Sequence, residues 1–515
     1  MPALAHPGAA PTRLHQLIDP WVAARPDALA VADAHVSLDY AQLHAVTVAA
    51  AAQLQSLGVR AGDRVLIVGE NCAAVGVFVL ALSRLDAWAS VVNARLSARE
   101  VDDFVVHSGA RRVLYTPHVS ADAQKHAERH GAQAVEWAGL GPLPVGPLAE
   151  AVAPEPCHAA AEDQVAALIY TSGTSGAPKG VMLTHANLMF AAMASVHIRR
   201  FGPGDLIYSA LPMAHVVGLS TQFLGCMASG SAVLLEPRFS PAAMARAFAD
   251  KGVTAFTGVP AMFVKLLEWS RDQGVPLAAP KLRFLCVAGS PLTPALKADV
   301  EQVFGLQLNN GYGLTETAPT VAQTRIDVRR DDCAVGVPLP GVETRIVDAT
   351  GAEVPDAQIG ELWVRGPNLM KGYYRNAAQT RAAINAEGWF NTGDMARRTD
   401  DGALLIVGRS KELIIRSGFN VYPVEVEQVL NSHPDVVQSA VVGRTVEHNE
   451  EVVAFIETVS GAAFDEPALR LYLRERLSPY KLPTEIHCLA QLPTTPSGKI
   501  LKTALEAIAR QQSAA

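Results

Sequence analysis

Residues 170–181 read YTSGTSGAPKGV, and this stretch decides the fold of the 515-residue chain. An apolar run over 165–170 precedes it, and a helix-like segment follows Thr184. The apolar run has the length of a buried strand, so the pattern predicts a loop at the end of a strand, ahead of a helix.

The composition of this loop suits an anion such as a triphosphate. Small residues let backbone amides approach a negative charge, and hydroxyl groups and lysine donate hydrogen bonds to it. The residues of these kinds are Thr171, Ser172, Gly173, Thr174, Ser175, Gly176 and Lys179. A Walker loop is excluded, because GxxxxGK[ST] needs glycine at Pro178 and serine or threonine at Gly180. A flexible Gly/Ser linker is the other interpretation, but such linkers rarely follow a buried strand.

Further motifs carry a resemblance to a known family. The loop is followed by NNGYGLTET at 309–317, NTGD at 391–394, VGRSKE at 407–412 and PTTPSGKI at 493–500. In this order they resemble the motifs of the AMP-forming adenylating enzymes, which include acyl-CoA synthetases, peptide-synthetase adenylation domains and luciferases. The resemblance extends over roughly residues 15–505.

Helical and strand signals alternate along most of the chain, which predicts layered α/β structure. Helices are expected at 40–57, at 73–85, from the Ser97/Glu100 capping box to Gly109 and after Ser240, and strands at 64–68, 87–92, 206–210, 232–235, 254–257 and 282–287. Residues 119–163 are rich in alanine, glycine and proline and are expected to be a connection. Short strands after Cys333 predict a small β subdomain.

The predicted fold class is therefore α/β, with two domains. Residues 1–409 form a large N-terminal domain of layered α/β sheets plus the small β subdomain. Residues 410–515 form a smaller α+β C-terminal domain with helices near 423–431 and 466–477, and the resemblance implies that this domain is mobile.

Composition limits the partners and the compartment. With 49% hydrophobic and 18% charged residues the chain can bury large cores, and a net charge of −7 gives no basic surface for nucleic acid or an anionic membrane. The most apolar stretch, 72–82, is about half a membrane span, and the N-terminus lacks the apolar core of a signal peptide. The expectation is a soluble cytoplasmic protein without an integral membrane segment.

The cysteines show no spacing of a disulfide framework or a zinc motif. They are expected to be reduced, buried thiols and are Cys72, Cys157, Cys226, Cys286, Cys333 and Cys488.

Two strand ends are predicted to hold the adenine of ATP. The motif NNGYGLTET follows a strand-like run, which places Tyr312 on a loop at the C-terminal edge of a sheet, where its ring can stack on a base. The resemblance implies that adenine is lined by Asn310, Gly311, Tyr312, Gly313, Gly289, Ser290 and Pro291. It further implies that Thr315 contacts the α-phosphate and that Glu316, with Thr174, holds magnesium. Ser290 is alternatively the cap of a helix.

The resemblance assigns the remaining polar roles. Asp394 and Arg409 are expected to contact the ribose, and a carboxylate can indeed accept hydrogen bonds from both ribose hydroxyls. Lys499 would bridge the reacting carboxylate and the α-phosphate, and Lys411 would be the hinge of the C-terminal domain. For CoA, the candidates are Gly418 beside the pantetheine tunnel and Arg238 at the phosphates.

The acyl group is expected in an apolar pocket. His215 matches a histidine that gates this pocket in the family, with a purely structural histidine as the alternative, and many relatives carry an aromatic residue where Ala214 stands. The candidate wall residues are His215, Val216, Val217, Gly218, Val259, Gly311 and Ala318. An amino acid substrate is disfavoured, because no aspartate occupies the position that binds its ammonium group in relatives.

The predicted function is that of an AMP-forming acyl-CoA synthetase, with ATP and CoA as co-substrates and Mg²⁺ as cofactor. An apolar or aryl carboxylic acid is activated through acyl-AMP, and the catalytic candidates are Lys499, Thr315, Glu316 and His215. The alternatives are a ligase that passes the acyl group to a carrier protein, and a non-catalytic nucleotide- or acyl-CoA-binding relative. Short, medium-chain and aryl acids all fit, and the sequence leaves the oligomeric state open.

Overall fold

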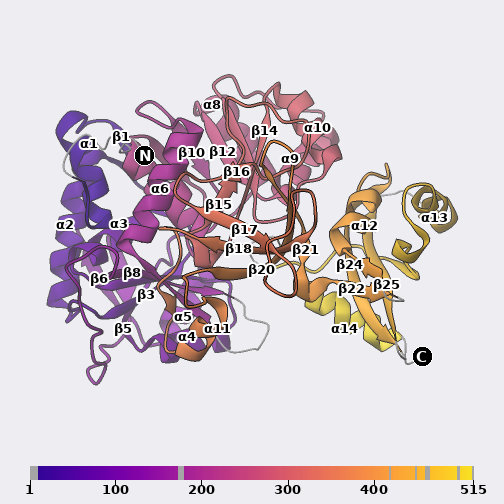
Figure 1. The fold of residues 1–515 in the computed structure, drawn as a ribbon. Helices are drawn as coiled ribbons and strands as arrows, with labels where there is room; N and C mark the ends of the chain where they lie inside the picture. Colours follow the sequence, from indigo (N-terminus) through magenta and orange to yellow (C-terminus); the bar gives the residue numbers. More distant parts are fainter. Residues whose placement is uncertain are drawn as a thin grey trace.

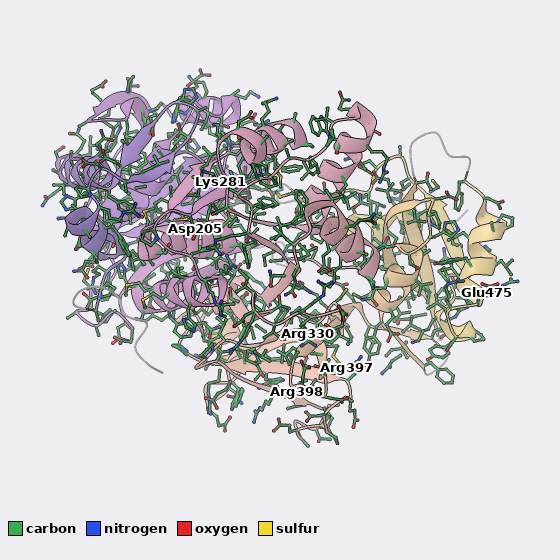
Figure 2. The ribbon with its side chains drawn as sticks, turned by 90° about the horizontal axis from the view of Figure 1, so that it is seen from above. Asp205, Lys281, Arg330, Arg397, Arg398 and Glu475 are labelled. Atoms are coloured by element: carbon green, nitrogen blue, oxygen red, sulfur yellow. The ribbon has the colours of Figure 1, made fainter. Side chains whose placement is uncertain are left out.

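A computed structural model describes residues 10–171, 179–416, 419–446, 449–458, 464–495 and 499–512. Figure 1 shows a large body built from the first four-fifths of the chain and a smaller C-terminal domain beside it. Viewed from above, Glu475 marks the small domain and Asp205 lies within the large one (Figure 2). The chain thus has the predicted α/β class, with a large N-terminal and a smaller C-terminal domain.

Two large sheets form the body of the N-terminal domain, as far as the described residues extend. The first has nine strands in the spatial order β16 (Val337–Pro338), β15 (Thr320–Gln323), β14 (Leu308–Gly313), β13 (Phe284–Ala288), β12 (Ala255–Gly258), β10 (Leu206–Ser209), β11 (Ala232–Leu235), β1 (Leu29–Ala32) and β2 (Ser37–Asp39). The second has eight, in the order β19 (Gly372–Tyr373), β9 (Lys179–Thr184), β8 (Val165–Thr171), β4 (Trp88–Asn93), β3 (Arg64–Gly69), β5 (Ala110–Tyr115), β7 (Gly141–Val145) and β6 (Gln133–Trp137).

Helices cover these sheets and share their core. They are η1 (Leu14–Ile18), α1 (Asp19–Ala24), α2 (Tyr40–Ser56), α3 (Ala73–Arg84), α4 (Ala98–Ser108), α5 (Ala121–Arg129), α6 (His185–Arg199), the π-helix η2 (Val217–Leu224), α7 (Gly225–Ser229), α8 (Pro241–Asp250), α9 (Pro260–Gln273), α10 (Pro294–Phe304), η3 (Thr315–Thr317) and α11 (Ala377–Ala383). Helix α3 is apolar on all sides and buried along 73–83, as expected for a helix enclosed by other layers. One hydrophobic core takes side chains from both sheets and from α2, α3 and α6.

After β16 the chain forms a four-stranded antiparallel sheet, which is the predicted β subdomain. Its strands are β17 (Glu343–Val347), β18 (Gly360–Arg365), β20 (Phe390–Arg398) and β21 (Leu404–Arg409). Figure 2 labels Arg397 and Arg398 on β20. Because β21 ends at Arg409, this sheet carries the chain to the small domain.

The small domain packs helices on a three-stranded sheet with its own core. After η4 (Ser410–Glu412) come β22 (Ile414–Arg416), β23 (Phe419–Val421), α12 (Pro423–Leu430), β24 (Val436–Val446), β25 (Asn449–Thr458), α13 (Glu466–Arg474), η5 (Pro479–Lys481), β26 (Glu485–Cys488) and α14 (Lys502–Gln512). Its exact boundary at 409/410 stays a prediction.

Most predicted elements are present, but several expectations need correction. Residues 119–163 are more than a connection, because α5 and the hairpin β6–β7 lie within them. The loop after β8 does not lead directly to a helix. It is followed by strand β9, which pairs antiparallel with β8, and only then does α6 begin. Cys157 and Cys488 are exposed and Cys333 is half-buried, so only three of the six free thiols are buried as expected.

No helix among the described residues is long and apolar enough to cross a membrane.

Candidate active site

The predicted adenine residues of the NNGYGLTET motif lie on a strand rather than on a loop. Asn310, Gly311, Tyr312 and Gly313 all belong to β14, which pairs in parallel with β13 and antiparallel with β15. Gly313 must be glycine, because an added Cβ would lie 1.7 Å from the backbone oxygen of Pro319. The turn begins only after Gly313, and the η3 turn carries the next two predicted residues, Thr315 and Glu316.

A buried carboxylate joins this strand to the β subdomain. The Tyr312 hydroxyl donates to Oδ2 of Asp394 at 2.5 Å, and Nε of Arg409 lies 3.3 Å from Oδ1. Asp394 and Arg409 are directly paired across β20 and β21. Burial raises the pKa of Asp394, and the charge of Arg409 and the hydrogen bond from Tyr312 oppose that rise. Three predicted nucleotide residues therefore meet at one carboxylate.

Lys499 reaches this point from the small domain. Its Cε lies 3.6 Å from the position that a Cβ would take on Gly289, at the end of β13, and Cγ1 of Val259 lies 3.7 Å from the same position. Burial, and then the charge of Arg409, lower the pKa of the Lys499 ammonium, while the carboxylates of Asp394 and Glu316 oppose this. The structure thus brings Lys499 together with Gly289, Asp394 and Glu316, and its role at the α-phosphate stays a prediction.

The end of β13 resolves the second role considered for Ser290. Helix α10 starts at Pro294, and its N-cap is Thr293, whose hydroxyl accepts from the amide of Leu296. Ser290 is therefore not the cap of this helix. Gly289 has φ of +82°, a conformation that glycine adopts without strain, and it turns the chain at the strand end so that Lys499 can approach.

His215 lies near Lys499 at the start of the predicted acyl pocket. Burial, followed by the charge of Lys499, lowers the pKa of His215 to about 3, so the imidazole is neutral at ordinary pH. Its Nδ1 accepts from the amide of Val217 at 3.4 Å. A residue that the sequence analysis missed fixes the preceding segment: the side chain of Asn71 donates to the carbonyl of Leu211 and accepts from the amide of Met213.

The other candidate wall residues are apolar and closely packed. Val216, Val259 and Ala318 are buried. Gly218 cannot carry a side chain, because a Cβ would lie 2.4 Å from the carbonyl oxygen of Pro212. The Ser220 hydroxyl donates to the carbonyl of Ala318 at 2.9 Å and so ties η2 to the turn after β14.

Tyr373, a second residue that the sequence did not single out, lies near both Lys179 and Glu316. The Tyr373 hydroxyl donates to Oε1 of Glu316 at 2.8 Å, and Nζ of Lys179 lies 5.9 Å from the centre of the Tyr373 ring. Thr171, at the end of β8, and Lys179, at the start of β9, flank the loop that is predicted to bind phosphate. The loop residues Ser172, Gly173, Thr174, Ser175 and Gly176 fall outside the described part of the chain.

The predicted CoA and hinge residues are placed only in part. Nε of Arg238 lies 2.9 Å from both oxygens of Glu70, and its Nη2 lies 3.2 Å from Asp122, so two carboxylates would compete with a CoA phosphate. Lys411 is exposed on η4, directly after β21. Gly418 is outside the described residues. These roles stay predictions.

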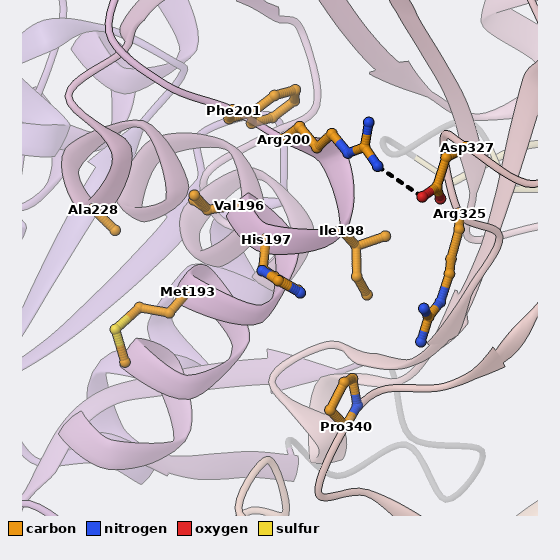
Figure 3. A pocket seen from close by; sticks show the side chains of 10 residues that line it. All are labelled: Met193, Val196, His197, Ile198, Arg200, Phe201, Ala228, Arg325, Asp327 and Pro340. Atoms are coloured by element: carbon orange, nitrogen blue, oxygen red, sulfur yellow. Dashed lines mark hydrogen bonds and ion pairs between the residues drawn. The ribbon is translucent and has the colours of Figure 1, made fainter. Parts of the chain in front are cut away.

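A cavity of about 520 Å³ lies elsewhere, on the outer face of α6 (Figure 3). Its lining contains none of the predicted site residues and consists of Met193, Val196, His197, Ile198, Arg200, Phe201, Ala228, Arg325, Asp327 and Pro340. An ion pair of 2.7 Å between Arg200 and Asp327 borders it. The cavity is therefore separate from the residues that converge on Lys499.

Comparison with known proteins shows which family and which relatives this chain is similar to. A family profile described as AMP-binding enzyme matches residues 18–374, and one described as AMP-binding enzyme C-terminal domain matches residues 425–499. A feruloyl-CoA synthase from Amycolatopsis sp is 35% identical over 479 residues, which are 93% of this chain and 95% of that protein. An indoleacetate–CoA ligase from Aromatoleum aromaticum is 32% identical over 498 residues, 95% and 96% of the two chains.

Solved structures show the same architecture. The crystal structure of ATP-bound MatB from Rhodopseudomonas palustris superposes with a TM-score of 0.85 at 29% identity, over 98% of this chain and all of that one. The apo form of the same protein superposes less well, with a TM-score of 0.76 over the same share of both chains. The overall structure of this chain is thus closer to the ATP-bound form of that protein than to its apo form.

Proposed function

We propose an aryl carboxylic acid as the substrate of this chain, which belongs to the AMP-binding enzyme family and is an AMP-forming acid–thiol ligase. One observation carries the assignment of the site. Lys499 of the small domain enters the large domain beside Gly289, within the electrostatic reach of Asp394, Glu316 and His215. A cation is thereby held next to the strand ends where ligands bind in α/β sheets.

The proposed chemistry has two steps. A carboxylate oxygen of the acid attacks the α-phosphorus of ATP, the bond to the bridging oxygen breaks, and pyrophosphate leaves. The CoA thiol then loses its proton, its sulfur attacks the acyl carbon of acyl-AMP, and AMP leaves. Lys499 would act in the first step by placing positive charge beside the α-phosphate as negative charge accumulates there. Neither step involves a covalent bond between the substrate and a side chain.

The same geometry supports the proposed nucleotide contacts. Asp394 accepts from Tyr312 through Oδ2 and faces Arg409 through Oδ1, so this carboxylate is fixed in place to receive the ribose hydroxyls. Mg²⁺ fits Glu316, because a carboxylate oxygen is the ligand that this ion prefers. When bound, the ion would supply positive charge to the triphosphate.

An uncharged acyl group follows from the wall residues. Val216, Val217, Val259 and Ala318 offer no charge, and the lowered pKa of His215 leaves its imidazole neutral. A carboxylic acid with a second charged group would lose its hydration there without a partner. Two relatives named for feruloyl and indoleacetate substrates, both aryl acids, support this class.

The test is pyrophosphate release from Mg-ATP across a panel of carboxylic acids, with mass spectrometry of the product formed with CoA. Aryl propenoic and arylacetic acids should give the highest kcat/KM and an acyl-CoA product. A preference for short or dicarboxylic acids would refute the substrate class. Pyrophosphate release without any thioester would instead favour transfer to a carrier protein, and no release with any acid would favour a non-catalytic binding protein.

Two expectations from the sequence stay proposals. We place the boundary between the domains at residues 409 and 410, because η4 and the exposed Lys411 follow β21 there. A location in the cytoplasm stays a prediction as well.

A further inference from the structure

Three potential metal ligands meet outside the candidate active site. Asp33 lies in the turn between β1 and β2, Cys72 is the N-cap of α3, and His118 lies in the loop after β5. Their ligand atoms, a carboxylate oxygen, the thiol sulfur and a ring nitrogen, all lie within 4.8 Å of one another. Segments far apart in sequence thus bring oxygen, sulfur and nitrogen donors to one point.

We propose that Asp33, Cys72 and His118 bind a thiophilic divalent transition-metal ion of the zinc class. Thiolate, imidazole and carboxylate are the three donor types that Zn²⁺ uses in proteins, whereas Mg²⁺ and Ca²⁺ avoid sulfur and nitrogen. Bonds of about 2.0 to 2.3 Å place tetrahedral ligands about 3.3 to 3.8 Å apart. Side-chain rotations that move the ligand atoms by about 1 Å would therefore bring all three within bonding distance of one ion.

The carboxylate of Asp33 is already oriented by backbone amides. Oδ1 accepts from the amides of His35 and Val36 at 2.7 Å each, and Oδ2 accepts from the amide of Ala73 at 2.8 Å. A carboxylate has about four lone-pair positions, so three amide donors leave one for a metal ion. Such outer hydrogen bonds hold a ligand in place and are typical of metal sites.

A buried hydroxyl beside the thiol points to the same ligand. Thr116 is fully buried, its Oγ1 forms no hydrogen bond of ordinary geometry among the described residues, and it lies within hydrogen-bonding reach of the Cys72 sulfur. A buried hydroxyl without a partner costs free energy. The metal-bound thiolate of Cys72 would accept from this hydroxyl, so metal binding would satisfy both groups.

His35 is the candidate fourth ligand. Its ring lies 5.5 Å from that of His118, edge to face, on the exposed side of the cluster. A structural zinc site takes four protein ligands, and a site with three keeps a water in the fourth position. Binding through His35 would close the site and tie the β1–β2 turn to α3 and to the loop after β5.

Cobalt(II) gives a direct test, because thiolate ligation produces an intense near-ultraviolet charge-transfer absorption that oxygen and nitrogen ligands do not. The full-length protein is stripped of metal with a chelator and titrated without nucleotide, in a Cys157→Ser/Cys488→Ser background that removes the exposed thiols. One equivalent of Co²⁺ should give this band, Cys72→Ser should abolish it, and Cys286→Ser, which alters another buried thiol, should keep it.

A second variant covers the case in which Cys72→Ser does not fold. His118→Ala should weaken cobalt binding at least tenfold, whereas His158→Ala, at an exposed histidine elsewhere, should leave it unchanged. Zn²⁺ should raise the Tm of the wild type and not that of Asp33→Asn. Absence of the charge-transfer band at one equivalent, or equal affinity in His118→Ala and the wild type, would overturn the proposal.

Discussion

Replacement of Lys499 by alanine should separate the two steps of the reaction. The side chain enters from the small domain, lies against Gly289 and interacts with the carboxylates of Asp394 and Glu316, beside the site proposed for the α-phosphate. Removal of one such charge-stabilising donor costs about 10² to 10³ in rate, or roughly 3 to 4 kcal/mol. Lys499→Ala should therefore form acyl-AMP at least a hundredfold more slowly.

The assay measures each step on its own. Acyl-AMP formation is followed as pyrophosphate release from acid and Mg-ATP, and thioester formation is followed with supplied acyl-AMP and CoA. The rate of thioester formation should stay near that of the wild type. In that step CoA attacks the acyl carbon, and no bond to phosphorus is made or broken. If Lys499→Ala slows both steps equally, the role assigned to this lysine is wrong.

Lys481→Ala is the matched control. This lysine also belongs to the small domain and forms an ion pair of 2.6 Å with Glu425, which is not a candidate site residue. A partly exposed pair of this kind contributes little to stability. Both rates should therefore be unchanged in Lys481→Ala, and a loss comparable to that of Lys499→Ala would point to general disturbance of the small domain.

Three further outcomes follow from the site. Asp394→Asn should weaken ATP binding, measured by titration calorimetry, at least tenfold, since hydrogen bonds to an ionised acceptor contribute about 1.5 to 3 kcal/mol. Because burial raises the pKa of Asp394, the ionised carboxylate lowers the stability of the fold above that pKa, so the Tm of the variant near pH 7 should not fall. Gly311→Leu should shift the acid panel toward smaller acids by about tenfold or more per methylene, with Gly202→Leu, a glycine with open space around it, as control. Since the pKa of His215 is lowered from 6.5 to about 3, its contribution to stability is full above pH 6.5 and is lost as the pH falls toward 3, so His215→Gln should flatten the fall in Tm with acid.

Short-range sequence signals predicted most elements, because the contacts that begin and end helices and turns join residues that are close in sequence. The box of Ser97 and Glu100 caps α4, and Gly109 ends that helix with φ of +58°. The proline-rich stretch concealed the β6–β7 hairpin, since proline usually interrupts a ladder. Strand β7 tolerates Pro142 and Pro144 because it meets β5 only at Val145 and pairs along its length with β6 alone.

The sequence motifs named residues that the structure brings together around Asp394 and Lys499, but they could not name residues whose contacts arise only in the tertiary structure. Asn71 and Tyr373 resemble ordinary polar and aromatic residues in sequence, yet one fixes the segment ahead of His215 and the other holds the carboxylate of Glu316. Strand β14 was predicted as a loop for the same reason, because its continuation through Gly313 depends on pairing with β15, which lies beyond the turn.

The order of the site residues along the chain determines what a rotation of the small domain can change. Tyr312, Asp394 and Arg409 all precede Lys411, and their mutual contacts lie within the large domain. If the small domain rotates at Lys411, the proposed hinge, the three residues proposed to hold the ribose would stay together, and Lys499, which follows Lys411 in the chain, would be withdrawn. Acyl-AMP would stay bound while the cation needed only for its formation moves away. A substitution in the large domain should accordingly affect both steps, whereas a substitution at the small-domain lysine should affect one.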